Sequence, residues 1–315
     1  MTTQTVLITG GAGFIGSHLA DAFVARGDRV LVVDDLSSGR RAQVPAAAEF
    51  HQLDVRSEAA AKLVEGAGVH LLVHQAAQMD VRRSVRDPLF DADVNVLGTL
   101  NLLEAARRGG VRQVLFASTG GAIYGEQERF PAGEDHPLRP VSPYGVSKLA
   151  VERYLYFYHA AHGLDAVCLR YANVYGARQS PHGEAGVVAI FLDRLLAGEP
   201  ATINGDGEQT RDYVHVADVV RANLAAAGRR GFAVYNVGTG RETSVVELYR
   251  LLAGAAGVEL EPRFAPAKPG EQRRSVVDAS RLAAELGVGE LTELADGLRA
   301  TAEWFRAARE ANAGR

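Results

Sequence analysis

The stretch VLITGGAGFIG, residues 6–16, joins an apolar run to the start of an apolar helix. Its glycines have separate physical tasks: Gly10 allows a sharp turn off the strand, Gly13 lets backbone N–H groups approach a phosphate, and Gly16 lets the helix pack close to the sheet. The N-terminus of the helix, at Phe14 and Ile15, presents unpaired N–H groups and a partial positive charge to an anion. The stretch predicts a strand, turn and helix that hold the pyrophosphate of a dinucleotide.

A second apolar run, residues 29–33, ends in Asp34. An acid about 20 residues after the glycines is typical of a group that binds the ribose hydroxyls of the adenosine. Its carboxylate would repel a 2′-phosphate, so the sequence favours NAD over NADP. Arg40 and Arg41 lie near enough along the chain to leave NADP as the alternative.

Short apolar runs alternate with helical patterns through the first half of the chain. Strands are expected at residues 49–53, 70–74, 113–117 and 166–170, and helices at 57–65, 88–108 and 143–162. This alternation predicts an α/β fold, a Rossmann-like doubly wound parallel sheet with helices on both faces. Ligands of such a sheet bind beyond the carboxyl ends of the strands, where the sequence places the polar residues Asp34, Asp54, Gln75, Ser118 and Thr119.

The regular alternation of strands and helices ends at about residue 170, and loops, prolines and shorter elements dominate after it. Helices are expected at 187–197, 244–253 and 291–311, and a strand and turn at 201–207. We interpret this half as a smaller substrate-binding lobe that covers the cofactor. The expected division is an NAD-binding domain of residues 1–172, rejoined by about 210–232, and a nucleotide-sugar lobe of residues 173–209 and 233–315.

The 315 residues carry a formal net charge of −4 and are 47% hydrophobic. This charge, with scattered basic residues, indicates no general affinity for nucleic acid or for an anionic membrane. No stretch approaches the roughly 18 apolar residues of a spanning helix, and the first residues do not read as a signal peptide. Cys168 is the only cysteine, which excludes an internal disulfide and fits a reducing compartment. We therefore expect a cytoplasmic protein without a metal site.

Tyr144 and Lys148 are four residues apart, so they share one face of the helix expected at 143–162. A free tyrosine titrates at about pH 10 and is a poor base at neutrality. A nearby ammonium and a positively charged nicotinamide ring favour the phenolate. The phenolate can then take a proton from a sugar hydroxyl while hydride leaves the same carbon for NAD⁺. The pair predicts redox chemistry at a carbinol, with both residues also contacting the cofactor.

Further ordered motifs extend this interpretation over nearly the whole chain. The chain resembles the extended short-chain dehydrogenase/reductase superfamily, and within it the nucleotide-sugar epimerases of the UDP-glucose 4-epimerase type. The motifs are TGGAGFIG (9–16), LDV (53–55), HQAAQ (74–78), NVLGT (95–99), YGVSK (144–148), RYANVYG (170–176) and RDYVH (211–215).

The resemblance implies roles for a set of residues around the cofactor and the substrate. Toward the cofactor it implies adenine contacts from Asp54 and Val55, and a lining formed by Gln75, Ala76, Ala77, Gln78, Asn95 and Tyr171. Toward the substrate it implies that Asn173 and Arg211 hold the diphosphate. The base is held by Thr202, Ile203 and Asn204, and the later segment with Lys268 and Glu271 comes back to contact the nucleotide.

Ser275 falls where the family has a residue facing the C2 substituent of the sugar. A large tyrosine at that place leaves room for a hydroxyl only, whereas a small residue leaves room for an N-acetyl group. The resemblance therefore implies that N-acetylhexosamines are accepted as well as plain hexoses. A surface serine in a shifted segment, between Arg274 and Val276, is the alternative.

One position departs from the family pattern. Four residues before Tyr124 the family carries a serine or threonine, and this chain has Gly120. We expect Thr119 to supply the missing hydroxyl between Tyr144 and the sugar oxygen, with Ser118 as the second choice. The loop contains two glycines, which allow either hydroxyl to move into place.

Gly120 and Gly121 also lack the acidic residues that related 4,6-dehydratases and decarboxylases carry there. The resemblance thus implies an NAD-dependent epimerase that inverts C4 of a UDP-hexose, UDP-glucose or UDP-galactose, through a transient 4-keto intermediate. The alternatives are another nucleotide-sugar-modifying enzyme of the superfamily, such as a reductase or an epimerase of a different base, and a non-catalytic NAD-sensing protein. Because family members commonly pair through the helices expected here at 88–108 and 143–162, a homodimer is expected.

Overall fold

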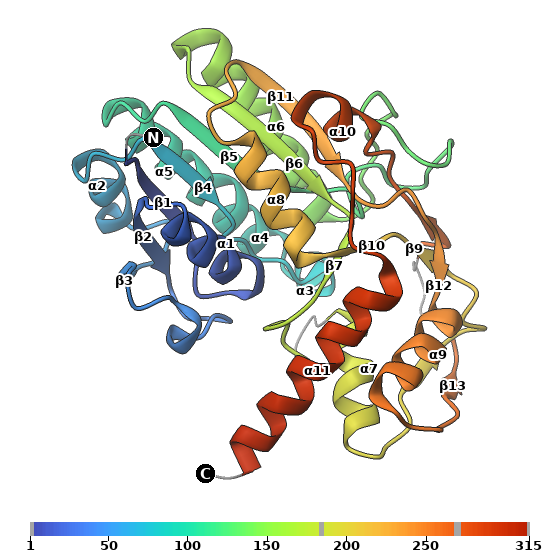
Figure 1. Ribbon diagram of the computed structural model, residues 1–315. Coiled ribbons are helices and arrows are strands. Elements are labelled where there is room, and N and C mark those ends of the chain that lie inside the picture. The colour runs from blue at the N-terminus through green and yellow to red at the C-terminus, as the bar shows by residue number, and fades with distance from the viewer. Residues whose placement is uncertain (1–2, 183–185, 268–271, 314–315) are drawn as a thin grey trace.

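A large parallel sheet forms the centre of the molecule (Figure 1). The computed structural model describes residues 3–182, 186–267 and 272–313. The sheet has seven strands in the order β11-β6-β5-β4-β1-β2-β3, and every pairing in it is parallel. The strands are β1 (Thr5–Thr9), β2 (Arg29–Asp34), β3 (Glu49–Gln52), β4 (Leu71–His74), β5 (Gln113–Thr119), β6 (Asp165–Tyr171) and β11 (Phe232–Val237). The predicted Rossmann-like α/β fold is confirmed.

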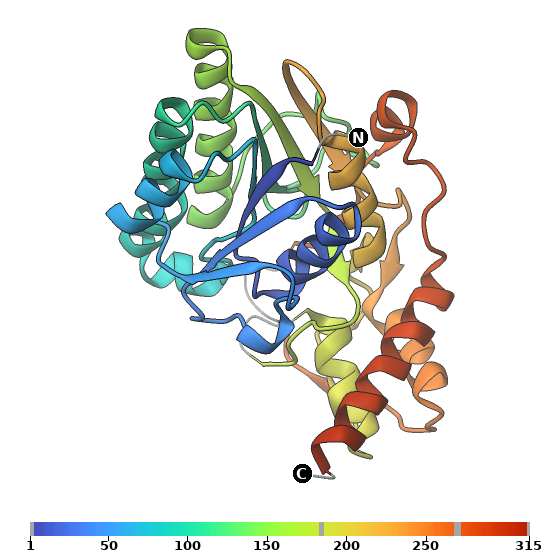
Figure 2. The same cartoon turned by 60° about the vertical axis from the view of Figure 1, so that its left-hand side comes forward.

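Helices cover both faces of the sheet, as Figure 2 shows from the side. One face carries α1 (Phe14–Ala25) and α8 (Val216–Ala226), and the other carries α2 (Glu58–Gly66), α5 (Gly98–Arg108) and α6 (Pro143–His162). Strand side chains alternate between the two layers: Val6 and Ile8 belong to the core beneath α1 and α8, and Leu7 belongs to the core on the other face. Each face thus has its own continuous apolar core.

The single helix expected at 88–108 is interrupted. It consists of α4 (Pro88–Ala92), a π-helical stretch η2 (Asp93–Leu97) and α5, preceded by a short α3 (Val81–Arg86). Wide π-helical turns are uncommon and often mark functional sites. The turn here contains Asn95, whose side chain bonds to the backbone of Gln78 rather than to solvent. A tertiary contact therefore sets the local helix geometry.

The smaller lobe has a third apolar core, formed mainly by the helices α7 (Val187–Leu196), α9 (Val245–Ala256) and α11 (Leu294–Ala313). These three helices lie side by side at the lower right of Figures 1 and 2. Short strands connect the lobe to the large sheet: β7 (Asn173–Tyr175), β8 (Thr202–Asn204), β9 (Thr210–Arg211), β10 (Tyr213–His215), β12 (Thr243–Ser244), β13 (Arg263–Ala265) and β14 (Arg274–Ser275).

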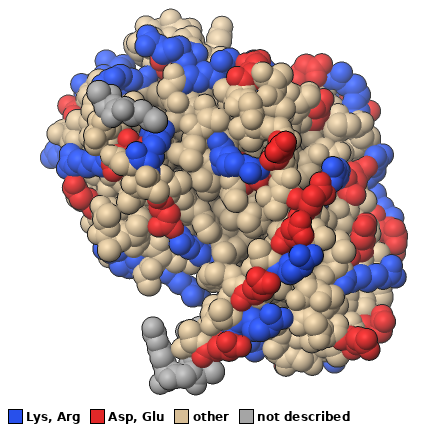
Figure 3. Space-filling model, in the orientation of Figure 1, with Lys and Arg blue, Asp and Glu red and all other residues tan. Residues whose placement is uncertain are grey.

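The chain does not stay in the smaller lobe after residue 173. It returns to the large sheet with α8 and β11, enters the lobe again with α9, and comes back with α10 (Ser280–Leu286), which packs on β11 and α8. No helix of the described residues is long and apolar enough to cross a membrane. On the face shown in Figure 3, acidic and basic residues are interspersed along α11.

Candidate active site

The glycine loop lies where the strand order changes direction, with β2 on one side of β1 and β4 on the other. Gly10 has a φ of 68°, and a Cβ there would lie 2.7 Å from the backbone nitrogen of Ala76. A Cβ on Gly16 would collide with the carbonyl oxygen of Gly10. Both positions therefore require glycine, as the motif predicts.

Gly13 has a different surrounding. A Cβ on Gly13 would meet only the Gly10 carbonyl oxygen, at 3.2 Å, among the described residues. Helix α1 begins at Phe14 without a side-chain cap, so the backbone N–H groups of its first turn, including that of Ile15, are not served by a capping residue. A cradle of open backbone at a helix N-terminus fits a pyrophosphate.

Asp34 is buried at the end of β2. Its Oδ2 accepts a hydrogen bond from the Ala12 N–H, and its Oδ1 accepts one from the Leu36 N–H, both at 2.9 Å. Burial raises the pKa of Asp34, and the two backbone donors oppose that shift. The carboxylate thus ties the glycine loop to the end of β2, and its remaining lone pairs can accept ribose hydroxyls.

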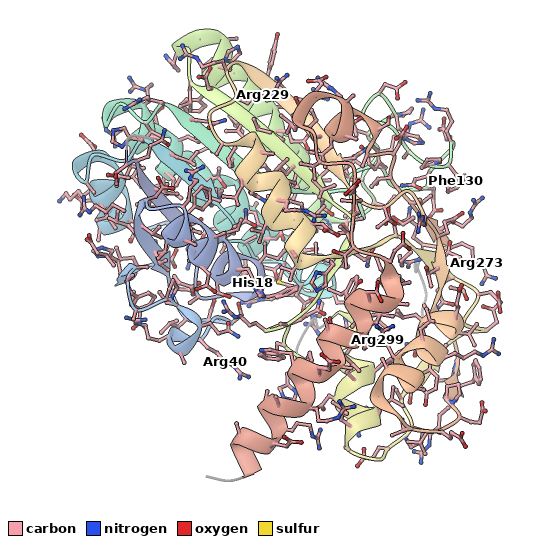
Figure 4. All side chains as sticks on the ribbon, viewed as in Figure 1. His18, Arg40, Phe130, Arg229, Arg273 and Arg299 are labelled. Atoms are coloured by element: carbon pink, nitrogen blue, oxygen red, sulfur yellow. The ribbon has the colours of Figure 1, made fainter. Side chains whose placement is uncertain are left out.

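The two arginines that left NADP open have separate positions. Arg40 is exposed at the edge of the molecule, where Figure 4 labels it. Arg41 begins the short 3₁₀ helix η1 (Arg41–Gln43), and its guanidinium lies 4.7 Å from the centroid of the Phe50 ring.

Asp54 and Val55, the residues expected to contact adenine, follow β3. The Asp54 carboxylate forms an ion pair with Arg56 at 2.5 Å, and Arg56 also reaches Asp93 at 2.6 Å. The Arg56 hydrogen bond lowers the pKa of Asp54. The side chain of Val55 is buried in the core next to α2 and α5, so only its backbone is open to a cofactor.

The segment 75–78 leaves β4 directly beside the glycine loop. The Asn95 side chain forms two hydrogen bonds with the backbone of Gln78. Its Oδ1 accepts from the Gln78 N–H at 2.8 Å, and its Nδ2 donates to the Gln78 carbonyl at 2.9 Å. Gln75 donates to the Tyr171 hydroxyl at 3.2 Å. Gln75, Ala76 and Ala77 are partly exposed, and Gln78 is buried. The structure therefore brings this segment and Asn95 together as one unit.

Tyr171, which is expected to line the cofactor, is buried at the end of β6. It belongs to the core beneath α1 and α8, and its hydroxyl also accepts a hydrogen bond from Asn223 at 2.8 Å. Burial raises the pKa of Tyr171 to about 12. The Tyr171 hydroxyl thus holds the Gln75 side chain from the side of the core.

Tyr144 and Lys148 lie in the first turns of α6, which begins with Ser142 as its N-cap and Pro143. The Lys148 ammonium is buried, donates to the Ala117 carbonyl at 2.8 Å, and lies 5.8 Å from the centroid of the Tyr144 ring. Burial lowers the pKa of Lys148 to about 8. Burial also raises the pKa of Tyr144, which favours the protonated phenol.

The two candidate hydroxyls on β5 differ in their partners. Ser118 donates to Glu152 at 2.6 Å, and Glu152 forms a buried ion pair with Arg170 at 2.6 Å. Thr119 makes no such bond within the described part of the chain. Its Oγ1 lies 4.0 Å from the point that a Cβ on Gly121 would occupy.

The presence of glycine at position 120 has a steric explanation. A Cβ on Gly120 would lie 2.9 Å from Cγ1 of Val277 and 3.2 Å from the carbonyl oxygens of Arg170 and Tyr171. A serine or threonine at position 120 would therefore require the Val277 side chain to move and the end of β6 to give slightly. The space beside Gly121 is open instead, and Asn173 Oδ1 lies 3.8 Å from its Cβ position. Thr119 and Asn173 therefore face the same space.

The expected substrate residues lie on the short strands of the lobe. Asn173 begins β7, Arg211 ends β9, and Ser275 is buried on β14 opposite Arg211. Thr202, Ile203 and Asn204 form β8, in which Ile203 is buried in the lobe core and Thr202 is exposed. Lys268 and Glu271 lie outside the described residues.

Three buried polar groups escaped the sequence analysis. Asp91 accepts side-chain hydrogen bonds from three different elements. His74 lies between the hydroxyls of Thr9 and Thr99, at 2.7 and 2.8 Å. Arg170 pairs with Glu152. A polar residue inside an otherwise apolar stretch was their only signal, and this signal does not identify the partners. No group of metal-binding side chains occurs within residues 3–182, 186–267 and 272–313.

A family model described as the NAD dependent epimerase/dehydratase family matches residues 6–238. The chain belongs to this family, in agreement with the cradle and the Tyr144–Lys148 pair, and NAD is its cofactor.

Individual relatives agree with this assignment. The chain is 48% identical over 306 residues to a UDP-glucose 4-epimerase of Mycolicibacterium smegmatis, covering 95% of this chain and 98% of the relative. It is 45% identical to the UDP-glucose 4-epimerase of Thermotoga maritima solved with UDP-glucose, with a TM-score of 0.95 over 97% of this chain and 100% of that one. The Thermus thermophilus UDP-glucose 4-epimerase solved with NAD is 46% identical, with a TM-score of 0.89 and the same coverage.

Proposed function

We propose that this enzyme inverts C4 of a UDP-hexose, interconverting UDP-glucose and UDP-galactose through a transient 4-keto sugar. The observation that carries the proposal is the position of Tyr144 and Lys148. They lie at the carboxyl end of β5, on the same edge of the sheet as the glycine cradle. The similarity to UDP-glucose 4-epimerases, one of them solved with UDP-glucose, supports this choice of sugar nucleotide.

In this proposal Tyr144 is the general acid and base. Its phenolate takes the proton of the C4 hydroxyl. NAD, held by the glycine cradle and Asp34, would supply the hydride acceptor and donor at C4. Tyr144 then gives the proton back to the C4 oxygen. Lys148, fixed on the Ala117 carbonyl, supplies a positive charge that favours the phenolate.

Thr119 is proposed as the hydroxyl between Tyr144 and the sugar oxygen. Its Oγ1 faces the space that it shares with Asn173. The Ser118 hydroxyl is committed to Glu152, and the Tyr124 hydroxyl donates to Asn236. Both are therefore weaker candidates for the same task.

The proposed substrate contacts follow from the lobe. Asn173 and Arg211 are assigned to the diphosphate, and Thr202 and Asn204, with the backbone of Ile203, to the base. Ser275 is assigned to the C2 side of the sugar because it lies on β14 directly opposite Arg211. Its small side chain leaves room for an N-acetyl group.

A dehydratase is the second candidate reaction on this scaffold. Elimination of water needs an acid or base beside the hydroxyl-bearing residue, as general acid–base catalysis requires a side chain in reach of the moving proton. Gly120 and Gly121 offer none, and a side chain at position 120 would press against Val277. This favours inversion over elimination.

We also propose a cytoplasmic homodimer that pairs through α4, α5 and α6. Leu89 is 83% exposed, Leu97 58% and Val146 52%, which is unusual for apolar side chains on neighbouring helices. Tyr154 and Phe157 are exposed on α6 as well, whereas Tyr158 is buried and donates to Glu104. The division into an NAD-binding domain and a nucleotide-sugar lobe is likewise a proposal, with β11 and α10 counted with the large sheet on which they pack.

The deciding experiment is incubation of the purified protein with UDP-galactose and no added NAD. Appearance of UDP-glucose to an equilibrium mixture is expected, because each turnover restores the cofactor. A panel of UDP-, dTDP- and GDP-sugars, followed by NMR at C4, separates this reaction from epimerisation on another base. Release of a dehydrated 4-keto sugar would instead identify a dehydratase, and net consumption of reduced cofactor would identify a reductase.

A further inference from the structure

Asp91 is a buried carboxylate beside the catalytic pair. It lies on the short helix α4 and is fully inaccessible to solvent. Oδ1 accepts from Gln78 Nε2 at 2.9 Å and from Asn95 Nδ2 at 3.0 Å. Oδ2 accepts from Ser147 Oγ at 2.6 Å.

These three donors come from the parts that must meet for the reaction. Gln78 belongs to the segment after β4, Asn95 to the π-helical turn, and Ser147 to α6 directly before Lys148. One carboxylate therefore fixes the position of the segment after β4 and of the π-helical turn relative to α6, the helix that carries Tyr144 and Lys148. No basic side chain of the described chain forms an ion pair with Asp91, and a buried charge without such a partner is costly unless it is fully hydrogen-bonded.

Several charged groups of the other elements packed on α6 have partners of their own, and Arg82 and Arg86 of α3 are exposed to solvent. On η2, Asp93 pairs with Arg56. On β6, Arg170 pairs with Glu152 of α6 itself. On α5, Glu104 pairs with Arg107 and accepts from Tyr158 at the far end of α6.

Two further groups belong to the same surroundings. On α3, the guanidinium of Arg83 lies 3.9 Å from the centroid of the Phe90 ring. Burial lowers the pKa of His74 on β4 to about 3, so this residue is neutral. Asp91 is thus a buried negative charge near Tyr144 and Lys148. Its charge favours the protonated form of both, so it adds to the effect of burial on the pKa of Tyr144 and opposes the effect of burial on the pKa of Lys148.

We propose that Asp91 is a positioning residue whose carboxylate holds Gln78, Asn95 and Ser147 in one register and whose negative charge sets the pH range in which Tyr144 and Lys148 work. This inference rests on the proposed roles of Tyr144 and Lys148. It adds a residue that touches neither cofactor nor substrate and acts through the pair.

Asp91→Asn separates the charge from the hydrogen bonds. The amide oxygen can replace Oδ1 and accept from Gln78 and Asn95. The amide nitrogen can replace Oδ2 and donate to Ser147, because a hydroxyl both donates and accepts. Ser147→Ala is the matched control: it removes one hydrogen bond to Asp91 and keeps the charge.

The measurement is the pH profile of kcat for UDP-galactose epimerisation by the NAD-containing enzyme. Loss of a negative charge stabilises the phenolate of Tyr144 and destabilises the ammonium of Lys148. Both limbs of the Asp91→Asn profile are therefore expected to move to lower pH, by on the order of one unit, while Ser147→Ala keeps the wild-type limbs. Limbs that stay in place, or that move to higher pH, would overturn the proposal even if kcat falls.

A second measurement is independent of turnover. Tyrosinate absorbance is titrated in the wild type minus Tyr144→Phe, and in Asp91→Asn minus the Asp91→Asn/Tyr144→Phe double variant. A lower pKa of Tyr144 in the second difference supports the role of Asp91 even if UDP-galactose proves not to be the substrate; an equal pKa refutes it. If Asp91→Asn does not fold, Asp91→Ser, which is uncharged and smaller, is measured in the same way.

Discussion

The Ser118 hydroxyl donates a 2.6 Å hydrogen bond to Glu152, whose carboxylate is also paired with Arg170. Its neighbour Thr119 ends β5 with a hydroxyl directed at the space beside Gly121. Two adjacent hydroxyls therefore have different tasks. Ser118 completes a buried polar network, and Thr119 is the hydroxyl that we propose for the substrate.

Thr119→Val is expected to reduce kcat by about 100-fold, because a positioned proton-transfer group contributes at least that much. Ser118→Ala is the control, with a small effect on kcat and a loss of roughly 1 kcal/mol of stability from the broken hydrogen bond. Steady-state kinetics and urea unfolding of both variants check this. The opposite order of kcat values would assign the hydroxyl between Tyr144 and the sugar oxygen to Ser118. If both variants keep full activity, a water molecule takes that place.

Tyr144→Phe is expected to lose about 10²–10⁴-fold in kcat, because it removes the group that takes the proton. The ring and its packing remain, so the variant should still copurify with NAD. Single-turnover assays and the NAD content of the denatured protein provide the two measurements. Near-native turnover would exclude Tyr144 as the base.

The Asp34 carboxylate predicts the identity of the bound dinucleotide. It is held against the glycine loop by the Ala12 N–H, where a 2′-phosphate would meet a negative charge. Protein denatured after purification should therefore release NAD, as chromatography of the supernatant can show. Recovery of NADP would contradict this, and loss of NADP in an Arg40→Ala or Arg41→Ala variant would then identify the arginine responsible.

Ser275→Tyr tests the sugar pocket. The wild type is expected to interconvert UDP-GlcNAc and UDP-GalNAc as well as UDP-glucose and UDP-galactose, and the variant to lose only the acetylated pair. Because Ser275 is buried beside Arg211, Ser275→Ala serves as a control that keeps the space. Inactivity of the wild type on acetylated sugars would refute the pocket assignment.

His74 makes stability depend on pH. Burial lowers its pKa from 6.5 to about 3, so only the unfolded chain takes up a proton between those values. The stabilisation is complete above pH 6.5 and is lost as the pH falls, by about 2 kcal/mol at pH 5. Urea unfolding at pH 7.5 and pH 5 should show a smaller difference for His74→Gln than for the wild type. Equal differences would mean that His74 is not the group responsible.

The sequence predicted those elements whose cause is local. The glycine motif led to α1, and the run of residues 143–162 matches α6 at both ends because Ser142 and Pro143 begin it and Gly163, in the left-handed conformation, ends it. The strands of the first half were placed within one or two residues, as buried apolar runs allow.

Elements that depend on distant contacts could not be predicted in this way. The π-helical turn exists because Asn95 bonds to Gln78, 17 residues earlier. Helix α8 and strand β11 were not recognised as separate elements, because their apolar patterns resemble those of the lobe around them. Asp91 and the Ser118–Glu152 contact were missed for a related reason: a polar residue in a sequence does not reveal whether its partners are protein groups or solvent.

The return of the chain to the large sheet has a consequence for how the protein can be divided. β11 lies at one edge of the sheet, and α8 packs beside α1 on one face of it. Both elements nevertheless follow the first strands of the lobe in sequence. No single cut after residue 173 yields one fragment with a complete sheet and another with a complete lobe. Limited proteolysis should therefore not release a stable half, and the two parts should lose their structure in one cooperative transition on heating.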